Sequence, residues 1–343
     1  MKFSFSEHKT SIISVFIGLS VVTGILFYIG PNKVVSQIKT LGFMGFGMIL
    51  LSFCLTFIFW TASWLVIMKA YGVKAPLGAS LGARVSSFAV SYLTPSMHFG
   101  GEPVRAMLIT KRSDASYTRS FATIATERIT SALAMLCYIM LGAFEGIYSQ
   151  LPSNTLIYLI LLTIIFLALL VLIIVNFVKG YFIFSRFIGF LERLFPYIAL
   201  LEKAEETVEK LEKDISSSFR GHLKHTFIAF LLNLVATFFM FIRPGIFFYF
   251  SQGKILTFPQ ISVIFALLSL LASFFWVTPG GLGIAEGGLI GIFALIGASG
   301  SDAVAYSFSV KIVEMIFVSF GIAWMARFGI IEILFSGKKE EEE

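Results

Sequence analysis

Six long, mainly apolar runs divide the chain into segments of the length that a membrane-spanning helix needs. The predicted spans are residues 11–29, 41–68, 121–147, 156–178, 223–250 and 303–334. About 20 consecutive apolar residues are enough to cross the hydrocarbon core of a bilayer. Lys and Arg gather outside these runs, mainly at the start of the chain and at 69–74, 111–119, 179–224 and 338–339. The pattern predicts an all-α polytopic membrane protein.

Two shorter apolar stretches each lead into a glycine-rich motif. Residues 76–93 precede TPSMHFGGEPVR (Thr94–Arg105), and residues 259–277 precede TPGGLGIAE (Thr278–Glu286). In both motifs a Thr-Pro pair begins eight positions before a glutamate. Non-helical backbone survives at membrane depth only where protein buries it or water lines it, and a carboxylate there indicates a functional site. Two such motifs at matched spacing predict a transporter built from two repeats.

The distribution of basic residues decides how these stretches are threaded through the membrane. Cytoplasmic loops are enriched in Lys and Arg. With both termini in the cytoplasm, this rule is met only if each motif stretch returns to the side from which it entered, 76–109 to the cytoplasm and 259–296 to the outside. We therefore expect about six full spans and two re-entrant helical hairpins in an inverted-topology repeat, an architecture that places a binding site near the midplane.

The chain is expected to form a single transmembrane domain, residues 1–343. Its first repeat covers 41–148, its second covers 223–335, and a charged tail follows at 336–343. Between the repeats lies a cytoplasmic or interfacial amphipathic segment, 179–222. Apolar residues at three-four spacing within this segment indicate a helix whose charge run is a solvated face.

Composition and missing motifs narrow the function classes. Hydrophobic residues make up 57% of the chain and charged residues 13%, and basic cytoplasmic loops explain the net charge of +6 without a nucleic-acid partner. The sequence has no HExxH zinc motif, G-x-S-x-G elbow, P-loop, dinucleotide fingerprint or acidic metal cluster. We therefore expect a multi-pass protein of the cell (plasma) membrane that is no enzyme and has no catalytic residue, metal or cofactor.

Four ionisable residues near the first motif form the strongest candidate site. Glu102 and Arg105 are three positions apart and so share a helix face, whereas the adjacent Glu127 and Arg128 point in different directions. Because an isolated charge at this depth costs about 2.5–3.5 kcal/mol on insertion scales, we expect a paired network. The alternative is that these ion pairs only fix the hairpin. Arg84 is a further candidate partner for Glu102.

The glycine pairs Gly100-Gly101 and Gly280-Gly281 have two interpretations. Their backbone N–H groups could form an anion site at a helix start, where Arg105 would add a forked donor suited to phosphate. Alternatively, these glycines allow two helices to pack closely.

The second half offers fewer charged candidates. Glu286 closes the second motif, and Lys311 and Glu314 follow about one repeat length later, three positions apart. Arg243 precedes a proline inside a predicted span. Its side chain either binds lipid phosphate, neutralises Glu286 or extends to the membrane interface.

The motifs resemble those of a known family. TPSMHFGGEPVRAMLI, ATERI and TPGGLGIAEGGLIGIF are similar to the lysylphosphatidylglycerol synthase transmembrane region, also called the flippase-like domain. This region is the membrane half of the bacterial multiple peptide resistance factor and also occurs as stand-alone proteins. The resemblance covers about residues 11–335. Because it does not extend to the aminoacyl-transferase domain of that factor, synthase activity is not expected.

The resemblance implies that the protein translocates a lipid between leaflets, as a flippase or scramblase. The lipid would be an anionic or aminoacylated phospholipid or a polyprenyl phosphate. The family positions that match are Glu102, Arg105, Glu127, Arg128 and Glu286. Lys311 stands where an arginine is expected, which weakens a two-pronged phosphate contact there. In this interpretation the cations receive the phosphate, and the glutamates hold those cations or a cationic headgroup.

Two other functions are compatible with the sequence. One is an ion-coupled small-solute transporter in which Glu102 and Glu286 titrate. The other is a non-transporting subunit that presents a polyprenyl-phosphate lipid to a separate glycosyl- or aminoacyl-transferase. The partners implied are membrane lipids, such a transferase, and a second copy of the chain in a homodimer.

Overall fold

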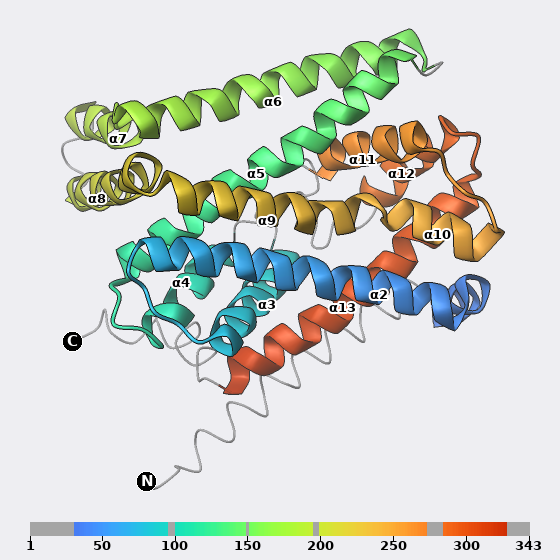
Figure 1. Ribbon diagram of the computed structural model, residues 1–343, viewed down its shortest axis with the longest axis horizontal. Helices are drawn as coiled ribbons and strands as arrows, with labels where there is room; N and C mark the ends of the chain where they lie inside the picture. The colour runs from blue at the N-terminus through green and yellow to red at the C-terminus, as the bar shows by residue number, and fades with distance from the viewer. Residues whose placement is uncertain (1–30, 95–99, 149–150, 195–198, 273–283, 328–343) are drawn as a thin grey trace, which may run out of the picture.

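The computed structural model describes residues 31–94, 100–148, 151–194, 199–272 and 284–327, and every regular element in these ranges is an α-helix (Figure 1). The helices are α2 (Pro31–Ala70), α3 (Leu77–Leu93), α4 (Glu102–Thr110), α5 (Tyr117–Tyr148), α6 (Ser153–Lys179), α7 (Ile183–Leu194), α8 (Ala199–Gly221), α9 (Leu223–Phe241), α10 (Arg243–Gln252), α11 (Phe258–Ala272), α12 (Ile284–Ala294) and α13 (Gly300–Arg327). The prediction of an all-α polytopic membrane protein is confirmed. The predicted span 11–29 and the tail 336–343 lie outside the described residues.

Five helical stretches of the described chain are long and apolar enough to cross a membrane. They are Lys39–Ala70 in α2, the whole of α5, α6 and α13, and Leu223–Gln252 across α9 and α10. Each overlaps one predicted span, so the count of six, which also needs residues 11–29, stays a prediction. α10 begins at Arg243-Pro244, because proline has no N–H to continue the hydrogen bonding of α9.

The two predicted hairpin stretches form pairs of short helices. α3 and α4 have 17 and 9 residues and contact each other, and α11 and α12 have 15 and 11 residues and do the same. At 1.5 Å per residue, the described part of each helix is shorter than the roughly 30 Å of a hydrocarbon core. The first pair lies toward one end of the long helices and the second toward the other end (Figure 1).

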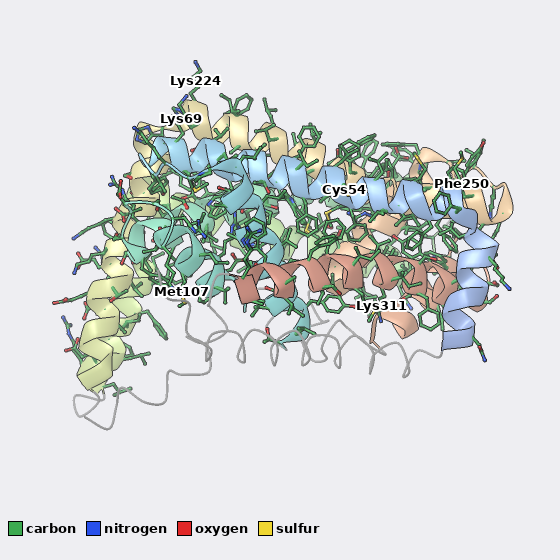
Figure 2. The ribbon with its side chains drawn as sticks, turned by 90° about the horizontal axis from the view of Figure 1, so that it is seen from below. Cys54, Lys69, Met107, Lys224, Phe250 and Lys311 are labelled. Carbon is green, nitrogen blue, oxygen red and sulfur yellow. The ribbon has the colours of Figure 1, made fainter. Side chains whose placement is uncertain are left out.

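The long helices connect these pairs. α2 packs along α9 and runs antiparallel to it, so that Lys69 at the end of α2 and Lys224 at the start of α9 lie at the same end of the molecule (Figure 2). α3 packs against α13, and α11 packs against α5. Both contacts depend on a glycine: a Cβ on Gly321 of α13 would lie 2.4 Å from the Val85 carbonyl oxygen, and one on Gly142 of α5 would lie 2.4 Å from that of Ser262.

The segment between the two halves forms α7 and α8. α7 exposes Phe184, Phe187 and Phe190, whereas α8 buries Ile215 and Phe219 in the core shared with α5 and α9. This division fits an interfacial helix resting on an amphipathic one. Part of the charge run is solvated as predicted, since the ion pair between Glu206 and Lys210 has side chains that are 70% and 69% exposed.

Glu212 departs from the solvated face that the sequence predicted. Its side chain is buried on α8 and accepts hydrogen bonds from the backbone N–H groups of Phe184 and Ser185, the Ser185 hydroxyl and the Asn176 amide. These donors belong to the start of α7 and the end of α6. The carboxylate is buried because it caps the first turn of α7, whose N–H groups have no partner within that helix.

Candidate functional site

Four of the predicted site residues come together around the first helix pair. Glu102 and Arg105 stand on the first turn of α4, and Glu127 and Arg128 stand on the facing turn of α5. Arg84 of α3 joins them. We call these five residues the charged cluster.

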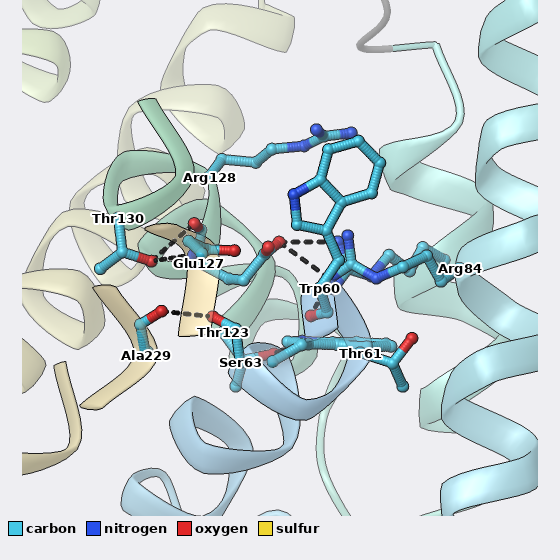
Figure 3. A network of polar contacts seen from close by, with 12 residues as sticks. Trp60, Thr61, Ser63, Arg84, Thr123, Glu127, Arg128, Thr130 and Ala229 are labelled. Atoms are coloured by element: carbon cyan, nitrogen blue, oxygen red, sulfur yellow. Dashed lines mark hydrogen bonds and ion pairs between the residues drawn. The ribbon is translucent and has the colours of Figure 1, made fainter. Parts of the chain in front are cut away.

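Ion pairs tie the charged cluster together across three helices. Glu127 Oε2 lies 3.1 Å from Arg84 Nη2 (Figure 3). The same oxygen lies 3.1 Å from Arg105 Nη1, so one carboxylate bridges α3 and α4. Arg128 points in a different direction and donates to Glu102 Oε1 from Nε at 2.6 Å and also from Nη2. Glu102 Oε2 lies 3.8 Å from Arg105 Nη1, as expected for residues three positions apart on a helix.

The charged cluster is buried except at one residue. The side chains of Arg84 and Glu102 are 5% exposed and those of Arg105 and Glu127 are 1% exposed, whereas Arg128 is 33% exposed. Three arginines and two glutamates leave a net charge of +1 inside the protein. Arg128 is therefore the member that a molecule from outside would meet first.

Two tryptophans of α2 cover the buried arginines, and the sequence reasoning did not include them. The Arg105 guanidinium lies 3.6 Å from the ring centroid of Trp64, and that of Arg84 lies 5.8 Å from the rings of both Trp60 and Trp64. Arg84 also donates to the Trp60 carbonyl oxygen at 2.9 Å. These contacts are cation–π interactions, which gain strength where water is excluded.

Several polar atoms of the charged cluster and of the adjacent Trp60 have no hydrogen-bond partner among the described residues. The donors are Arg84 Nε, Arg105 Nε, Arg105 Nη2 and Trp60 Nε1, and the acceptors are Glu102 Oε2 and Glu127 Oε1. An unsatisfied buried polar group typically costs about 1–3 kcal/mol. Such a concentration is unusual for a native protein and is expected where a ligand or water completes the bonding.

Gly101 of the first glycine pair serves close packing, one of the two interpretations. The Gly101 N–H donates to Ser91 Oγ at 3.0 Å, so this donor already has a partner on α3. A Cβ at Gly101 would lie 1.9 Å from the carbonyl oxygen of Ser87. Glycine there lets α4 start against α3 and brings Glu102 and Arg105 to the charged cluster. Gly280 and Gly281 lie outside the described residues.

Arg243, the first residue of α10, forms a separate site against the middle of α2. It is 7% exposed and donates from Nε to Ser52 Oγ at 3.2 Å and from Nη2 to Thr56 Oγ1 at 3.0 Å. Its guanidinium lies 3.5 Å from the ring centroid of Phe53. The side chain is therefore held inside the protein and does not extend to the membrane interface.

The other candidates of the second half lie on α12 and α13. Lys311 is 3% exposed, and Glu314, three residues later on α13, acts on Arg243 electrostatically. Glu286 belongs to the first turn of α12, and its side chain is outside the described part. The structure does not bring Arg243 or Lys311 into the charged cluster.

An aromatic series connects the two arginine sites. Phe53 and Phe57 of α2 stack on Phe317 of α13 with centroids 5.8 and 4.6 Å apart, and Phe57 also meets Trp60 at 5.8 Å. Phe88 of α3 packs on Phe57 at 5.3 Å. The charged cluster and Arg243 are thus separated by packed rings.

The described residues offer binding chemistry. No group of three or more His, Cys, Asp or Glu among them could hold a metal ion. The charged cluster presents forked arginine donors together with carboxylates that hold those donors in place. Such an arrangement suits an oxyanion such as phosphate.

The fold and the charged cluster define an integral, multi-pass helical membrane protein with a buried charged site. The chain belongs to the lysylphosphatidylglycerol synthase TM region family, whose model matches residues 15–321. The family that the two motifs indicated is therefore confirmed.

Two curated relatives span nearly the whole chain. The UPF0104 membrane protein PH1989 of Pyrococcus horikoshii is 22% identical over 309 residues, which cover 85% of this chain and 89% of that protein. A UPF0104 membrane protein of Methanothermobacter thermautotrophicus is 24% identical over 341 residues, which cover 94% and 96%.

Proposed function

We propose that the protein moves a phosphate-bearing lipid between the two leaflets of the cell membrane, as a flippase or scramblase. The observation that carries this proposal is the charged cluster, which combines a net charge of +1 with buried arginine donors that have no partner among the described residues. The phosphate would be held by Arg105 and Arg128, while the acyl tails stay in the bilayer. Binding and movement of a lipid need no covalent step, so the proposed function involves no enzymatic reaction.

The packing of the helix pairs supports an inverted repeat, which alternating access would use. α3 of the first half packs on α13 of the second, and α11 of the second packs on α5 of the first. Within each half, α4 packs against α5 and α12 packs against α13. A pseudo-two-fold exchange of this kind is common in transporters whose substrate site lies between two repeats. The proposed movement is a rocking of one half against the other.

The proposed orientation follows from the basic residues. Lys69 and Lys224 lie at the end of the molecule at which α7 and α8 are found (Figures 1 and 2). Because basic residues favour the cytoplasmic side, we assign this end and both termini to the cytoplasm. The first helix pair would then enter the membrane from the cytoplasm, and the second would enter it from outside.

Leaflet exchange in proteoliposomes tests the proposal. Purified protein is reconstituted with fluorescent phospholipids or a fluorescent polyprenyl phosphate, and the dye that dithionite can reach is followed over time. The test variant is Glu102→Gln, which removes the carboxylate that holds Arg128. The matched control is Glu206→Gln, at a side chain that is 70% exposed on α8.

We expect exchange faster than in empty vesicles, lost in Glu102→Gln and kept in Glu206→Gln. No exchange for any lipid, with or without a pH gradient, would refute the proposal. Uptake of a soluble solute by the same vesicles would then favour the small-solute transporter. Activity that appears only with an added transferase would favour the lipid-presenting subunit.

A further inference from the structure

We propose that the charged cluster selects lipids whose phosphate headgroup has a net negative charge and rejects the aminoacylated, net cationic phospholipid that the family's name suggests. The proposal rests on the function proposed above and specifies its substrate class. Phosphatidylglycerol and a polyprenyl phosphate share the selected chemistry.

The charge balance of the buried residues is the first argument. Among the described residues, Arg84, Arg105 and Arg128 form ion pairs with Glu102 and Glu127 alone, so one positive charge has no counter-ion within the charged cluster. Taking a charge out of water is unfavourable unless a partner of opposite sign is close. A headgroup of charge −1 neutralises the cluster, a zwitterionic headgroup leaves it at +1, and a lysylated headgroup of charge +1 raises it to +2.

The unsatisfied donors are the second argument. Arg105 has two nitrogens, Nε and Nη2, without a hydrogen-bond partner among the described residues, and Arg84 has one, Nε. Both side chains are at least nine-tenths buried, so bulk water does not serve these atoms. A phosphate group supplies several acceptor oxygens to such forked donors. An ammonium group has only donors and cannot bond to them.

The two free acceptors do not reverse this preference. Glu102 Oε2 and Glu127 Oε1 also lack hydrogen-bond partners among the described residues, but both carboxylates already pair with arginines. Hydroxyl groups can donate to these oxygens without adding charge. The glycerol headgroup of phosphatidylglycerol carries such hydroxyls, whereas an added ammonium would lie beside three guanidinium groups.

Arg128 provides the route by which a headgroup reaches the buried donors. Its side chain is 33% exposed, in contrast to the other four members. Among the described residues its hydrogen bonds go to Glu102, so an entering phosphate can take its guanidinium from that carboxylate. The phosphate would then meet Arg105, which lies 3.8 Å from the other oxygen of Glu102.

Lipid binding to the purified full chain in dodecyl maltoside micelles tests this selectivity without requiring transport. Tryptophan fluorescence is titrated with phosphatidylglycerol, polyprenyl phosphate, phosphatidylethanolamine and lysylphosphatidylglycerol, since Trp60 and Trp64 line the charged cluster. We expect both anionic lipids to bind at least about tenfold more tightly than the other two, as one charge-assisted hydrogen bond would provide.

Three variants locate the preference. Arg105→Gln removes the buried excess charge and should bring the affinity ratio close to one. Arg105→Lys keeps the charge but loses the forked donors, so its ratio should lie between those of the wild type and Arg105→Gln. Arg119→Gln removes an exposed charge near the start of the same α5 helix and should change nothing. If Arg105→Gln does not fold, Arg128→Gln, at the partly exposed member, replaces it.

The outcomes separate this inference from the proposed function. Equal or tighter binding of lysylphosphatidylglycerol, an unchanged ratio in Arg105→Gln, or an equal loss in Arg119→Gln overturns the selectivity. Selective binding without leaflet exchange would refute the flippase and leave the anionic site in place. Exchange of all headgroups at one rate would support the flippase and refute the selectivity. Binding of only one of the two anionic lipids identifies the source of the phosphate.

Discussion

Glu127 is the residue on which the charged cluster depends, and its replacement by glutamine gives the sharpest test of the structure. Glu127 bonds to Arg84 on α3 and to Arg105 on α4 at 3.1 Å each, and its side chain is 1% exposed. Glutamine has nearly the same shape and removes only the negative charge. The variant therefore leaves two buried guanidinium groups with Glu102 as the remaining carboxylate.

The expected loss of stability is about 3 kcal/mol. Removing one partner of a buried ion pair typically costs about 3–5 kcal/mol, because the other charge stays buried without compensation. We take the lower end because Glu102 remains 3.8 Å from Arg105 and the glutamine oxygen can still accept one hydrogen bond. A change of this size shifts the folding equilibrium by more than about 100-fold.

Unfolding by SDS in mixed micelles measures this free energy, and a surface variant calibrates it. Glu206→Gln breaks an ion pair of 4.0 Å between side chains that are 70% and 69% exposed. Surface substitutions of this kind usually change stability by less than about 0.5 kcal/mol. The difference between the two variants therefore measures the effect of burial on the free energy of unfolding, because both replace a glutamate by a glutamine.

A double variant tests whether charge balance is the cause. Glu127→Gln raises the net charge of the cluster to +2, Arg105→Gln lowers it to zero, and the double variant restores +1. We expect the double variant to cost at least about 1 kcal/mol less than the sum of the single ones, within the range seen for residues in contact. Additive losses, or a Glu127→Gln loss as small as that of Glu206→Gln, would refute the reasoning.

Three further predictions concern the fold. Gly321→Ala and Gly142→Ala should each reduce stability in SDS titration, because their Cβ atoms would lie 2.4 Å from backbone oxygens. Gly47→Ala is the control and should be neutral or slightly stabilising, because no atom lies within 4 Å of its Cβ position. Unchanged stability in the first two variants would contradict the close packing. Glu212→Ala should speed limited trypsin cleavage at Arg186 and Arg193, because α7 loses its cap, and Glu209→Ala, on the solvated face, should not. Burial raises the pKa of Asp214 on α8 despite the lowering effect of Arg119, so the ionised carboxylate disfavours the folded state above that pKa. Asp214→Asn should therefore stabilise the protein at pH 7 and lose this advantage below about pH 4, where the carboxyl is protonated even in the unfolded chain; a gain that does not depend on pH would exclude this cause.

Much of the fold follows from the sequence, because hydropathy and glycine content are local properties. The lengths of the apolar runs predict the five spans that the described residues contain, and the two Thr-Pro-glycine motifs predict where short helices form pairs. The three-residue spacing of Glu102 and Arg105 and the divergence of Glu127 and Arg128 also follow from helix geometry.

The partners within the site do not follow from the sequence, because they depend on how distant helices pack. Arg84, a predicted candidate partner for Glu102, bonds instead to Glu127, a residue 43 positions away, because α3 and α5 both pack against α2 and α4 in the folded chain. In the sequence, nothing distinguishes Trp60 and Trp64 from the other apolar residues of their span. Their four-residue spacing places them on one face of α2, and this was the only local signal that they act together.

Glu212 was missed for a different reason. The sequence of α8 alternates glutamate and lysine, and most of this run is solvated, so nothing local distinguishes one buried carboxylate from its neighbours. The signal lies on other elements. Phe182, the residue before α7, has no side-chain oxygen to accept from the first N–H groups of that helix, which donate instead to Asn176 of α6 and Glu212 of α8.

The charged cluster has features that ion pairing for stability alone does not explain. Apolar residues of similar volume often stabilise a core as well as a buried ion network does. A purely structural network would gain from equal numbers of acids and bases. This cluster has three arginines, two glutamates and several donors without a hydrogen-bond partner among the described residues. The two explanations give opposite results for Glu127→Gln in the presence of phosphatidylglycerol. A structural network would leave the variant equally unstable, whereas an anion site made more positive would bind the lipid more tightly and recover part of the lost stability.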